Sequence, residues 1–503
     1  MPLIRILVVG AGVCGPAFAT LLRRADPDLS RFDVTVVERA PRLRDTGLQI
    51  DLRAQAIPIV RKMGLLDAIR KRAVPERGVR IVDARGRAFA TFGSNDSGHG
   101  AQALTSEYEI MRGDLVDVFY RASLGLNPDR EEEGGDGGNG AASGEKAAKA
   151  AATAATRHSD EETLAGSGGV RYEFGVTVTD LAQRDDGDGP VVDVTFSDGR
   201  RGRYDLVVGA DGQSSRTRRL ALAAGEARFD PLGLVMAFYQ VPRGAEDDDW
   251  VRLHVMPGGR NIFVRSANEE APAQVYMSVW TDRTASVAAD AGENAGGDGD
   301  GDGGNAVLAA LGRPVAEQRS AFAAAYGDYH GWRVDELVGP LRRPRRQEDD
   351  DVPDFYAAEI GQVHCETLVK GRVVLLGDAG YCPSPITGMG TTLGVTGAYL
   401  LAGELVRRGG GGGSGGANED EDNVAGALAA YERAVRPFVG ESQTLFPGVP
   451  WAFFPRSRWG VWVMTTIVAV VARLRLIDLI LRLMPDSAGG LEIPEYPELN
   501  LET

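Results

Sequence analysis

The sequence predicts an α/β protein in which a mixed, largely parallel sheet is interrupted by an antiparallel-sheet domain and followed by C-terminal helices. Three observations support this fold class. The chain opens with an apolar strand, a glycine-rich turn and a helical pattern. Two later apolar strands end in glycine and aspartate. The segments between those strands alternate polar and apolar residues, which is typical of antiparallel strands.

The first turn carries the most specific motif. Residues 4–10, IRILVVG, form a continuous apolar run that is typical of a strand buried on both faces. GAGVCG follows at residues 10–15 and leads into a helix, and a second strand, DVTVVE, ends at Glu38. A GxGxxG turn between strand and helix, with an acid 23 residues beyond Gly15, predicts a Rossmann-like dinucleotide site.

Each residue of this turn has an expected role. Gly10 allows the tight turn, Gly12 lets the backbone approach a pyrophosphate, and Gly15 lets the helix pack on the strand. Val13 lies in the same turn, at the start of the helix, where free N–H groups attract an anion. Glu38 can accept both ribose hydroxyls and disfavours a 2′-phosphate, which indicates FAD or NAD rather than NADP as the held nucleotide.

Two later strands are expected to join the same sheet. YDLVVGADGQSSRTRR (204–219) and GRVVLLGDAG (371–380) place Asp211 and Asp378 after apolar runs. Open α/β sheets bind ligands at the carboxyl ends of their strands. After the second strand, TGMG (387–390) precedes another helix, and a helix N-terminus with flanking glycines is an anion site. The pyrimidine edge of a reduced flavin is a suitable anion.

The alternating segments divide the chain into discontinuous domains. Residues 77–92 are expected to form two strands around DARGR, and further alternating segments follow residue 229. The predicted domains are a nucleotide-binding domain (1–74, 101–228 and 354–440), a substrate-binding antiparallel-sheet domain (75–100 and 229–353) and a C-terminal helical segment (441–503).

Three low-complexity inserts account for the acidity of the chain. The formal net charge is −16, and residues 131–169, 285–305 and 409–423 together carry 14 of these charges. Their Gly/Ala/Asp-rich composition cannot bury much apolar surface, so we expect disordered surface loops. The remainder is nearly neutral and has no basic stripe, which argues against a nucleic-acid partner.

Cysteine and histidine usage predicts neither disulfides nor a metal site. The three cysteines and five histidines are scattered without ligand spacing, which favours a reducing compartment. The N-terminus enters a strand directly, without a signal or transit pattern. A cytoplasmic location is therefore expected.

Three motifs in this order resemble those of the class A FAD-dependent monooxygenases, the aromatic-hydroxylase-like flavoproteins. They are GAGVCG…VVER, DLVVGADGQSSRTRR and GDAGYCPSPITGMG. TGLQIDLRAQAIPIVRKMGLLDAI and the ending LEIPEYPEL resemble the tetracycline-hydroxylating branch in particular. The resemblance covers nearly the whole chain apart from the inserts.

The resemblance implies an oxidoreductase of secondary metabolism. It would hold FAD tightly, meet NADPH or NADH transiently, and insert one oxygen atom from O₂ into an aromatic or polycyclic small molecule through a flavin C4a-hydroperoxide. Two alternatives stay open: an FAD-dependent reductase or dehydrogenase of an unsaturated lipid or polyketide, and a non-catalytic flavin-binding protein.

The resemblance also implies roles for residues early in the chain. Glu38 would hold the adenosine ribose, with Arg39 near the adenine or diphosphate. Asp51 would contact FAD, and Arg112 would reach the ribityl-diphosphate region. Arg53 would face the flavin or NAD(P)H. As alternatives, Asp51 could cap a turn, Arg112 could be a surface residue, and Arg53 could have either role or none.

Later residues complete the implied cofactor site. Asp211 and Gly212 would contact FAD and the passing nicotinamide, unless Asp211 only caps the following helix. Asp378 would bind the ribityl hydroxyls, and Met389, between its glycines, would face the pyrimidine edge. The full predicted cofactor-binding set is Gly10, Gly12, Val13, Gly15, Glu38, Arg39, Asp51, Arg53, Arg112, Asp211, Gly212, Asp378, Pro385, Gly388, Met389 and Gly390.

No catalytic residue is predicted. Tyr239, His254 and Tyr276 lie on strands of the substrate domain, but packing or surface roles are expected for them. Near the C-terminus, GVWVMTTIVAVVA (460–472) is uncharged, and a helix of that length spans only ~20 Å, short of a ~30 Å hydrocarbon layer. We expect a helix that covers the flavin domain, with a membrane-surface helix as the alternative.

Overall fold

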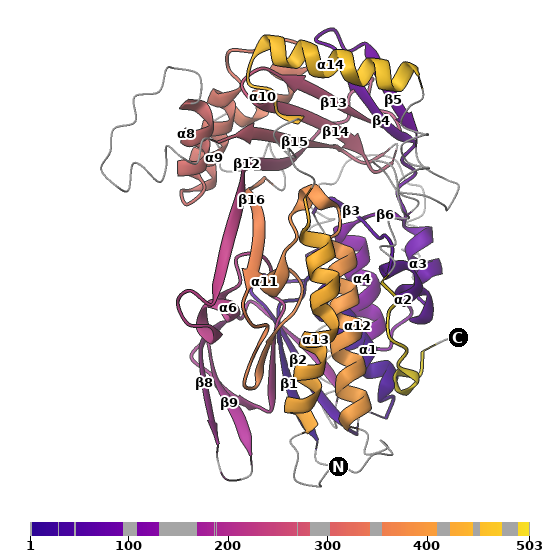
Figure 1. Ribbon diagram of the computed structural model, residues 1–503, viewed down its shortest axis with the longest axis vertical. Helices are drawn as coiled ribbons and strands as arrows, with labels where there is room; N and C mark the ends of the chain where they lie inside the picture. The colour runs from indigo at the N-terminus through magenta and orange to yellow at the C-terminus, as the bar shows by residue number, and fades with distance from the viewer. Residues whose placement is uncertain are drawn as a thin grey trace, which may run out of the picture.

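The structure is a computed structural model. It describes residues 3–28, 30–44, 47–93, 108–129, 169–185, 187, 189–268, 270–281, 302–342, 355–409, 423–445, 453–474 and 491–501. Figure 1 shows two sheets arranged along the long axis, with a bundle of helices beside the lower sheet and a single helix across the upper one.

The lower sheet has six strands in the order β17-β18-β11-β1-β2-β7. All neighbouring pairs are parallel except β17 with β18. Its strands are β1 (Ile4–Val9), β2 (Phe32–Glu38), β7 (Val170–Phe174), β11 (Leu206–Gly209), β17 (Val369–Lys370) and β18 (Val373–Leu375). The prediction that segments from the start, the middle and the last third of the chain share one sheet is confirmed.

Both faces of this sheet are covered, which explains the unbroken apolar run of β1. Ile6 and Val8 pack towards the helices, whereas Leu7 and Val9 pack against a second, three-stranded sheet. The covering helices are α1 (Cys14–Ala25), α4 (Arg112–Ser123), α12 (Gly390–Gly409) and α13 (Asn423–Gln443). The three-stranded sheet, β8 (Val178–Asp185), β9 (Pro190–Phe196) and β10 (Arg201–Tyr204), was not predicted.

The upper sheet has seven strands in the order β16-β12-β15-β14-β13-β4-β5. Its pairs are antiparallel except β4 with β13. The strands are β4 (Gly78–Val82), β5 (Ala88–Gly93), β12 (Ala227–Val241), β13 (Trp250–Met256), β14 (Arg260–Ser266), β15 (Ala273–Trp280) and β16 (Tyr356–Cys365), and the two strands expected within residues 77–92 are present as β4 and β5. The helices α8 (Asp302–Ala310), α9 (Val315–Ala325) and α10 (Val334–Arg342) pack on one face.

Short elements fill the junction between the sheets. A two-stranded sheet, β3 (Gln49–Asp51) with β6 (Glu109–Met111), lies there. The other short helices are α2 (Ala56–Lys62), α3 (Leu66–Lys71), α6 (Arg216–Ala221), α11 (Asp378–Tyr381), η1 (Pro385–Thr387) and η3 (Pro497–Leu499). The C-terminal segment returns to α12, where Tyr496 is buried and its hydroxyl donates to Glu404 over 2.8 Å.

Two expectations are corrected. The helix α14 (Arg458–Arg473) contacts β5 and β13 of the upper sheet, so the prediction that it covers the flavin domain is wrong. Residues 302–305, assigned to a disordered insert, form the first turn of α8, because Gly304 allows the helix to approach the carbonyl of Trp280. Most of the three predicted inserts, namely residues 131–168, 285–301 and 410–422, lies outside the described residues, and the domain boundaries stay predictions.

Candidate functional site: the carboxyl edge of the parallel sheet

Four parallel strands end at one edge of the lower sheet. The turns after β1, β2, β11 and β18 carry the sequence motifs GAGVCG, ERA, ADGQ and GDAG. Because parallel strands share a direction, these turns gather although they are separated by up to several hundred residues in sequence.

The turn after β1 packs so closely against neighbouring backbone that two of its positions leave no room for a side chain. Gly10 has a φ of +115°, and a Cβ there would lie 2.5 Å from the carbonyl oxygen of Ala210. A Cβ on Gly15 would lie 2.1 Å from the carbonyl oxygen of Gly10, so the helix α1 can begin this close only with glycine. Val13 occupies the N-cap position of α1.

Gly12 faces an arginine rather than backbone. A Cβ at Gly12 would lie 3.4 Å from a terminal nitrogen of Arg112, the first residue of α4. The backbone N–H of Arg112 donates to Leu48 over 2.9 Å, which fixes the start of that helix. The turn and the guanidinium therefore form a cradle suited to a diphosphate.

Glu38 is held at the end of β2. Its carboxylate accepts hydrogen bonds from the backbone N–H groups of Ala11 (3.0 Å) and Ala40 (2.9 Å). A carboxylate offers about four acceptor positions, so capacity for ribose hydroxyls remains. Arg39, the next residue, is exposed.

Asp378 begins α11 directly after the turn that follows β18. Burial raises the pKa of its carboxyl, and the positive charge of Arg112 opposes this shift. A Cβ at Gly390, the first residue of α12, would lie 3.9 Å from a carboxylate oxygen of Asp378. This carboxyl therefore lies between the first-turn cradle and the start of α12.

Cys14 has a packing role beneath this turn. A Cβ on either Gly377 or Gly394 would lie within 2.6 Å of the Cys14 sulfur, so the side chain fills the space between two glycines. Burial and the nearby charge of Asp378 raise the pKa of Cys14 to about 12, which keeps it a thiol.

Asp51 and Arg53 reach the start of α12 from β3. Arg53 donates to the Asp51 carboxylate in an ion pair. The Arg53 backbone exchanges hydrogen bonds with the hydroxyl of Thr392, at 3.0 and 3.1 Å. A Cβ on Gly388, which has a φ of +65°, would lie 3.8 Å from the Arg53 guanidinium carbon.

The segment before α12 is a compact turn. Pro385 opens the 3-10 helix η1, and Gly388 ends it in the left-handed conformation. The Met389 backbone N–H donates to the hydroxyl of Thr387 over 3.2 Å, and the Met389 carbonyl accepts the first bond of α12, from Leu393. Met389 thus sits where helix N–H groups begin to point outward.

Asp211 caps the start of α6. Its carboxylate accepts from the hydroxyl of Ser215 and from the backbone N–H groups of Arg216 (2.7 Å) and Thr217 (3.0 Å), at the start of α6. The capping alternative therefore describes this side chain. Gly212 has a φ of +79° and no heavy atom within 4 Å of a Cβ position, so it borders open space.

A row of aromatic rings lies on the face of the upper sheet that meets this edge. Tyr356, Phe238, Tyr276 and Phe263 stand on the neighbouring strands β16, β12, β15 and β14, with successive ring centroids 6.1, 5.1 and 5.1 Å apart. On the same face, the Gln274 side chain accepts a hydrogen bond from the Gln49 backbone of β3.

This aromatic row was not predicted. Its members come from four separate strands, whose paired residues lie between 13 and 118 positions apart in sequence, and only the strand register brings them into line. The alternation of each strand was visible in the sequence and could have indicated which positions share a face.

Comparison with known proteins identifies the family. Residues 4–293, more than half of the chain, match the family described as FAD binding domain. The FAD-dependent monooxygenase asL6 of Sarocladium schorii is 32% identical over 507 residues, with 99% of each chain covered. The chain belongs to the class A FAD-dependent monooxygenases.

Other relatives agree. The flavin-dependent monooxygenase eupH of Phoma sp is 31% identical, covering 99% of this monooxygenase and 98% of eupH. The crystal structure of tetracycline destructase Tet(51) superposes with a TM-score of 0.64 at 25% identity, covering 99% of this chain and 100% of that one. The resemblance found in the motifs and the predicted fold class are confirmed.

Tyr239, His254 and Tyr276 of the monooxygenase, for which packing or surface roles were expected, lie in different environments. Tyr239 is buried behind the sheet, where its hydroxyl donates to the Leu337 carbonyl over 2.9 Å. His254 hydrogen-bonds to the Val82 carbonyl and to the hydroxyl of Tyr329, on the side of α14. Only Tyr276 stands in the aromatic row, and burial raises its pKa.

Beside the aromatic row, a buried charge cluster joins the upper sheet of the monooxygenase to the two-stranded sheet of β3 and β6. Arg265 of β14 donates to the carboxylates of Glu76 and Glu109, and Gln49 donates to both carboxylates as well, at 3.1 and 3.0 Å. All three charged side chains are below 10% exposed. One arginine faces two carboxylates, and burial raises the pKa of Glu76 to about 7 despite Arg265.

This cluster should make stability depend on pH. The pKa of Glu76 is raised on folding from 4.5 to about 7. The contribution of this carboxyl to the free energy of unfolding is therefore complete below pH 4.5, and it is lost as the pH rises towards 7. Glu76→Gln imitates the protonated carboxyl, so the free energy of unfolding of this variant should fall by about 1–3 kcal/mol less than that of the wild type as the pH rises to 7. Chemical denaturation at several pH values measures the free energy of unfolding of both proteins. Glu317→Gln, at an exposed position of α9, should keep the wild-type profile, and a wild-type profile in Glu76→Gln would contradict the assignment.

Proposed function

We propose that this monooxygenase uses NADPH or NADH and O₂ to insert one oxygen atom into an aromatic or polycyclic small molecule. The nicotinamide supplies a hydride, one oxygen atom enters the product, and the other leaves as water. The aromatic row is the observation that carries the proposal, because it offers flat apolar rings on the face that meets the carboxyl edge. The similarity to a protein named as a tetracycline destructase supports a polycyclic substrate.

We propose that FAD lies along the carboxyl edge. The diphosphate would meet Gly12 and Arg112, the adenosine ribose would meet Glu38, and the ribityl chain would pass Asp378. The other predicted residues of the set (Gly10, Val13, Gly15, Arg39, Asp51, Arg53, Asp211, Gly212, Pro385, Gly388, Met389 and Gly390) would line the same path. When bound, FAD supplies the redox and oxygen chemistry.

The residues of the chain would bind, orient and shield the reactants. The start of α12 at Met389 would offer its free N–H groups and the positive end of the helix dipole to the electron-rich edge of the flavin ring. The rings of Phe238 and Tyr276, at 5.1 Å and nearly perpendicular, would hold a flat substrate and keep water away from it. The Tyr276 hydroxyl donates to Gln274 over 3.1 Å, which fixes the ring.

Oxygen-18 labelling tests the reaction type. With ¹⁸O₂, NAD(P)H and an aromatic compound that accelerates flavin reduction, we expect one labelled oxygen per product molecule by mass spectrometry. A product that gains two hydrogens without label would contradict oxygen insertion and indicate the reductase alternative. Absence of flavin reduction across a broad panel of aromatic and polycyclic compounds with either nicotinamide would contradict the proposal as a whole.

Removing a ring from the row should weaken substrate binding. Phe238→Leu is expected to raise KM by roughly twofold to tenfold, because an aromatic pair contributes about 0.5–1.5 kcal/mol beyond its buried area. Flavin content should not change. Phe322→Leu removes a buried ring on the opposite side of the sheet and should leave KM unaltered. Equal KM values for the wild type and Phe238→Leu would remove the row from the substrate site.

A further inference from the structure

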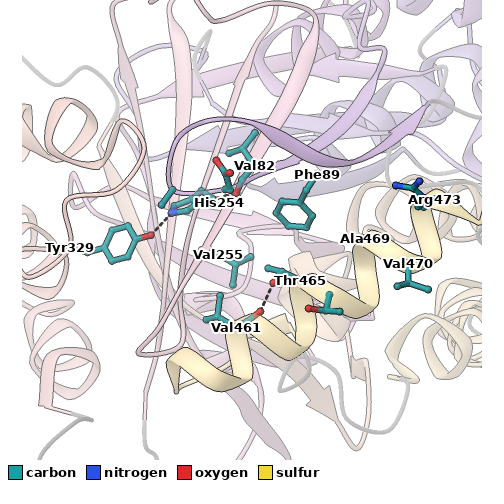
Figure 2. Close-up of a pocket in the computed structure, with 13 residues that line it drawn as sticks. Val82, Phe89, His254, Val255, Tyr329, Val461, Thr465, Ala469, Val470 and Arg473 are labelled. Carbon is teal, nitrogen blue, oxygen red and sulfur yellow. Dashed lines mark hydrogen bonds between the residues drawn. The ribbon is translucent and has the colours of Figure 1, made fainter.

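The helix α14 lies at the end of the molecule farthest from the parallel sheet (Figure 1). Its Val468 and Ala472 join the apolar cluster around β4 and β5. A crevice of about 470 Å³ runs along one flank of the helix, lined by Val461, Ala469 and the half-exposed Val470 (Figure 2). The helix is therefore seated on the sheet without being closely packed along its length.

The outward face of α14 is apolar and exposed. Trp459 and Trp462 are 71% and 61% exposed, and three further apolar side chains lie along the same stripe. They are Ile467, Val470 and Leu474, at 58%, 48% and 61%. Six of the ten large apolar side chains that the described part of the chain exposes fall within residues 453–474. So concentrated a patch indicates an interaction surface.

The patch is locally basic, whereas the chain outside its three acidic inserts is nearly neutral. Residues 453–474 contain Arg456, Arg458 and Arg473 and no acid. The exposed Arg458 and Arg473 stand at the two ends of α14. Basic residues beside an apolar stripe with tryptophans complement the headgroups and the acyl boundary of an anionic bilayer.

The length of the helix limits its orientation. Sixteen residues extend about 24 Å, which is less than a ~30 Å hydrocarbon layer. No helix within the described ranges is long and apolar enough to cross a membrane. We propose that α14 lies in the plane of an anionic phospholipid surface, with Trp459 and Trp462 at the headgroup level.

Vesicle flotation of the full, flavin-loaded chain tests the proposal. Wild-type protein should float with vesicles of phosphatidylcholine and phosphatidylglycerol, and much less with phosphatidylcholine alone. Trp459→Ser combined with Trp462→Ser should weaken binding by roughly tenfold or more. Arg458→Gln and Arg473→Gln should each weaken binding to anionic vesicles by roughly fivefold.

A matched control replaces exposed apolar residues elsewhere. Leu126→Ser combined with Val315→Ser should float as the wild type does, because neither residue belongs to the α14 surface. Flavin content and thermal unfolding show that each variant is folded. Wild-type protein that stays with the soluble fraction, or a tryptophan variant that floats undiminished, would overturn the proposal. A wild-type dimer that the tryptophan variant abolishes would overturn it too, by assigning the surface to a second copy of the chain.

Discussion

Asp378→Ala is expected to purify with little or no FAD and to bind added FAD roughly 10- to 100-fold more weakly than the wild type. The carboxyl lies beside the start of α12 and within the electrostatic influence of Arg112. A hydrogen bond from a hydroxyl to a charged group contributes about 1.5–3 kcal/mol, and its loss leaves a buried polar group of the ligand unsatisfied. Fluorescence titration of the deflavinated protein measures the dissociation constant.

Asp205→Ala is the matched control for this change. Asp205 precedes β11 at the opposite end of the sheet, where it pairs with Arg5 at 2.9 Å. Its loss should leave the affinity for FAD unchanged, because the site lies at the carboxyl ends of the strands. Full flavin occupancy in folded Asp378→Ala would remove Asp378 from the proposed site.

Gly12→Val should abolish FAD binding without unfolding the protein. Gly12 has an ordinary φ, and a Cβ would meet only the tip of the Arg112 side chain, at 3.4 Å. A branched side chain would nevertheless occupy the cradle in which backbone N–H groups must approach the diphosphate. We expect colourless protein by absorbance spectroscopy, with a circular dichroism spectrum like that of deflavinated wild type.

Gly312→Val provides the comparison. Gly312 lies between α8 and α9, has no heavy atom within 4 Å of a Cβ position, and does not adopt a positive φ. The same substitution there should leave a yellow protein. Yellow Gly12→Val with a wild-type dissociation constant would place the diphosphate elsewhere.

The first turn could be predicted because its chemistry is local. Gly15 is required by its contact with Gly10 in the same turn, and Gly10 by its contact with Ala210 after the neighbouring strand. The spacing of the motif places a glycine at both positions. Asp378 and the start of α12 were likewise predicted from a motif contiguous in sequence, and their contact with FAD stays a proposal. Asp211 was expected to contact FAD and the passing nicotinamide, with a cap of the following helix as the alternative. Its hydrogen bonds show the cap, and the cofactor contact stays a prediction.

Features that depend on distant pairing could not be predicted. The line from Tyr356 to Phe263 exists only because four strands adopt one register, and single strands do not specify their partners. The sequence showed that α14 is apolar, but an apolar helix can pack on any apolar surface of the protein. Its position on β5 and β13 was therefore not predicted. The cluster of Glu76, Glu109 and Arg265 likewise joins three separate segments.

A crystal structure of the FAD-loaded protein tests the proposed site most directly. We expect the diphosphate between Gly12 and Arg112, the ribityl chain beside Asp378, and the isoalloxazine ring between the start of α12 and the aromatic row of the upper sheet. Flavin density away from the start of α12, or a ring that does not face Phe238 and Tyr276, would contradict both the cofactor path and the substrate site inferred from it.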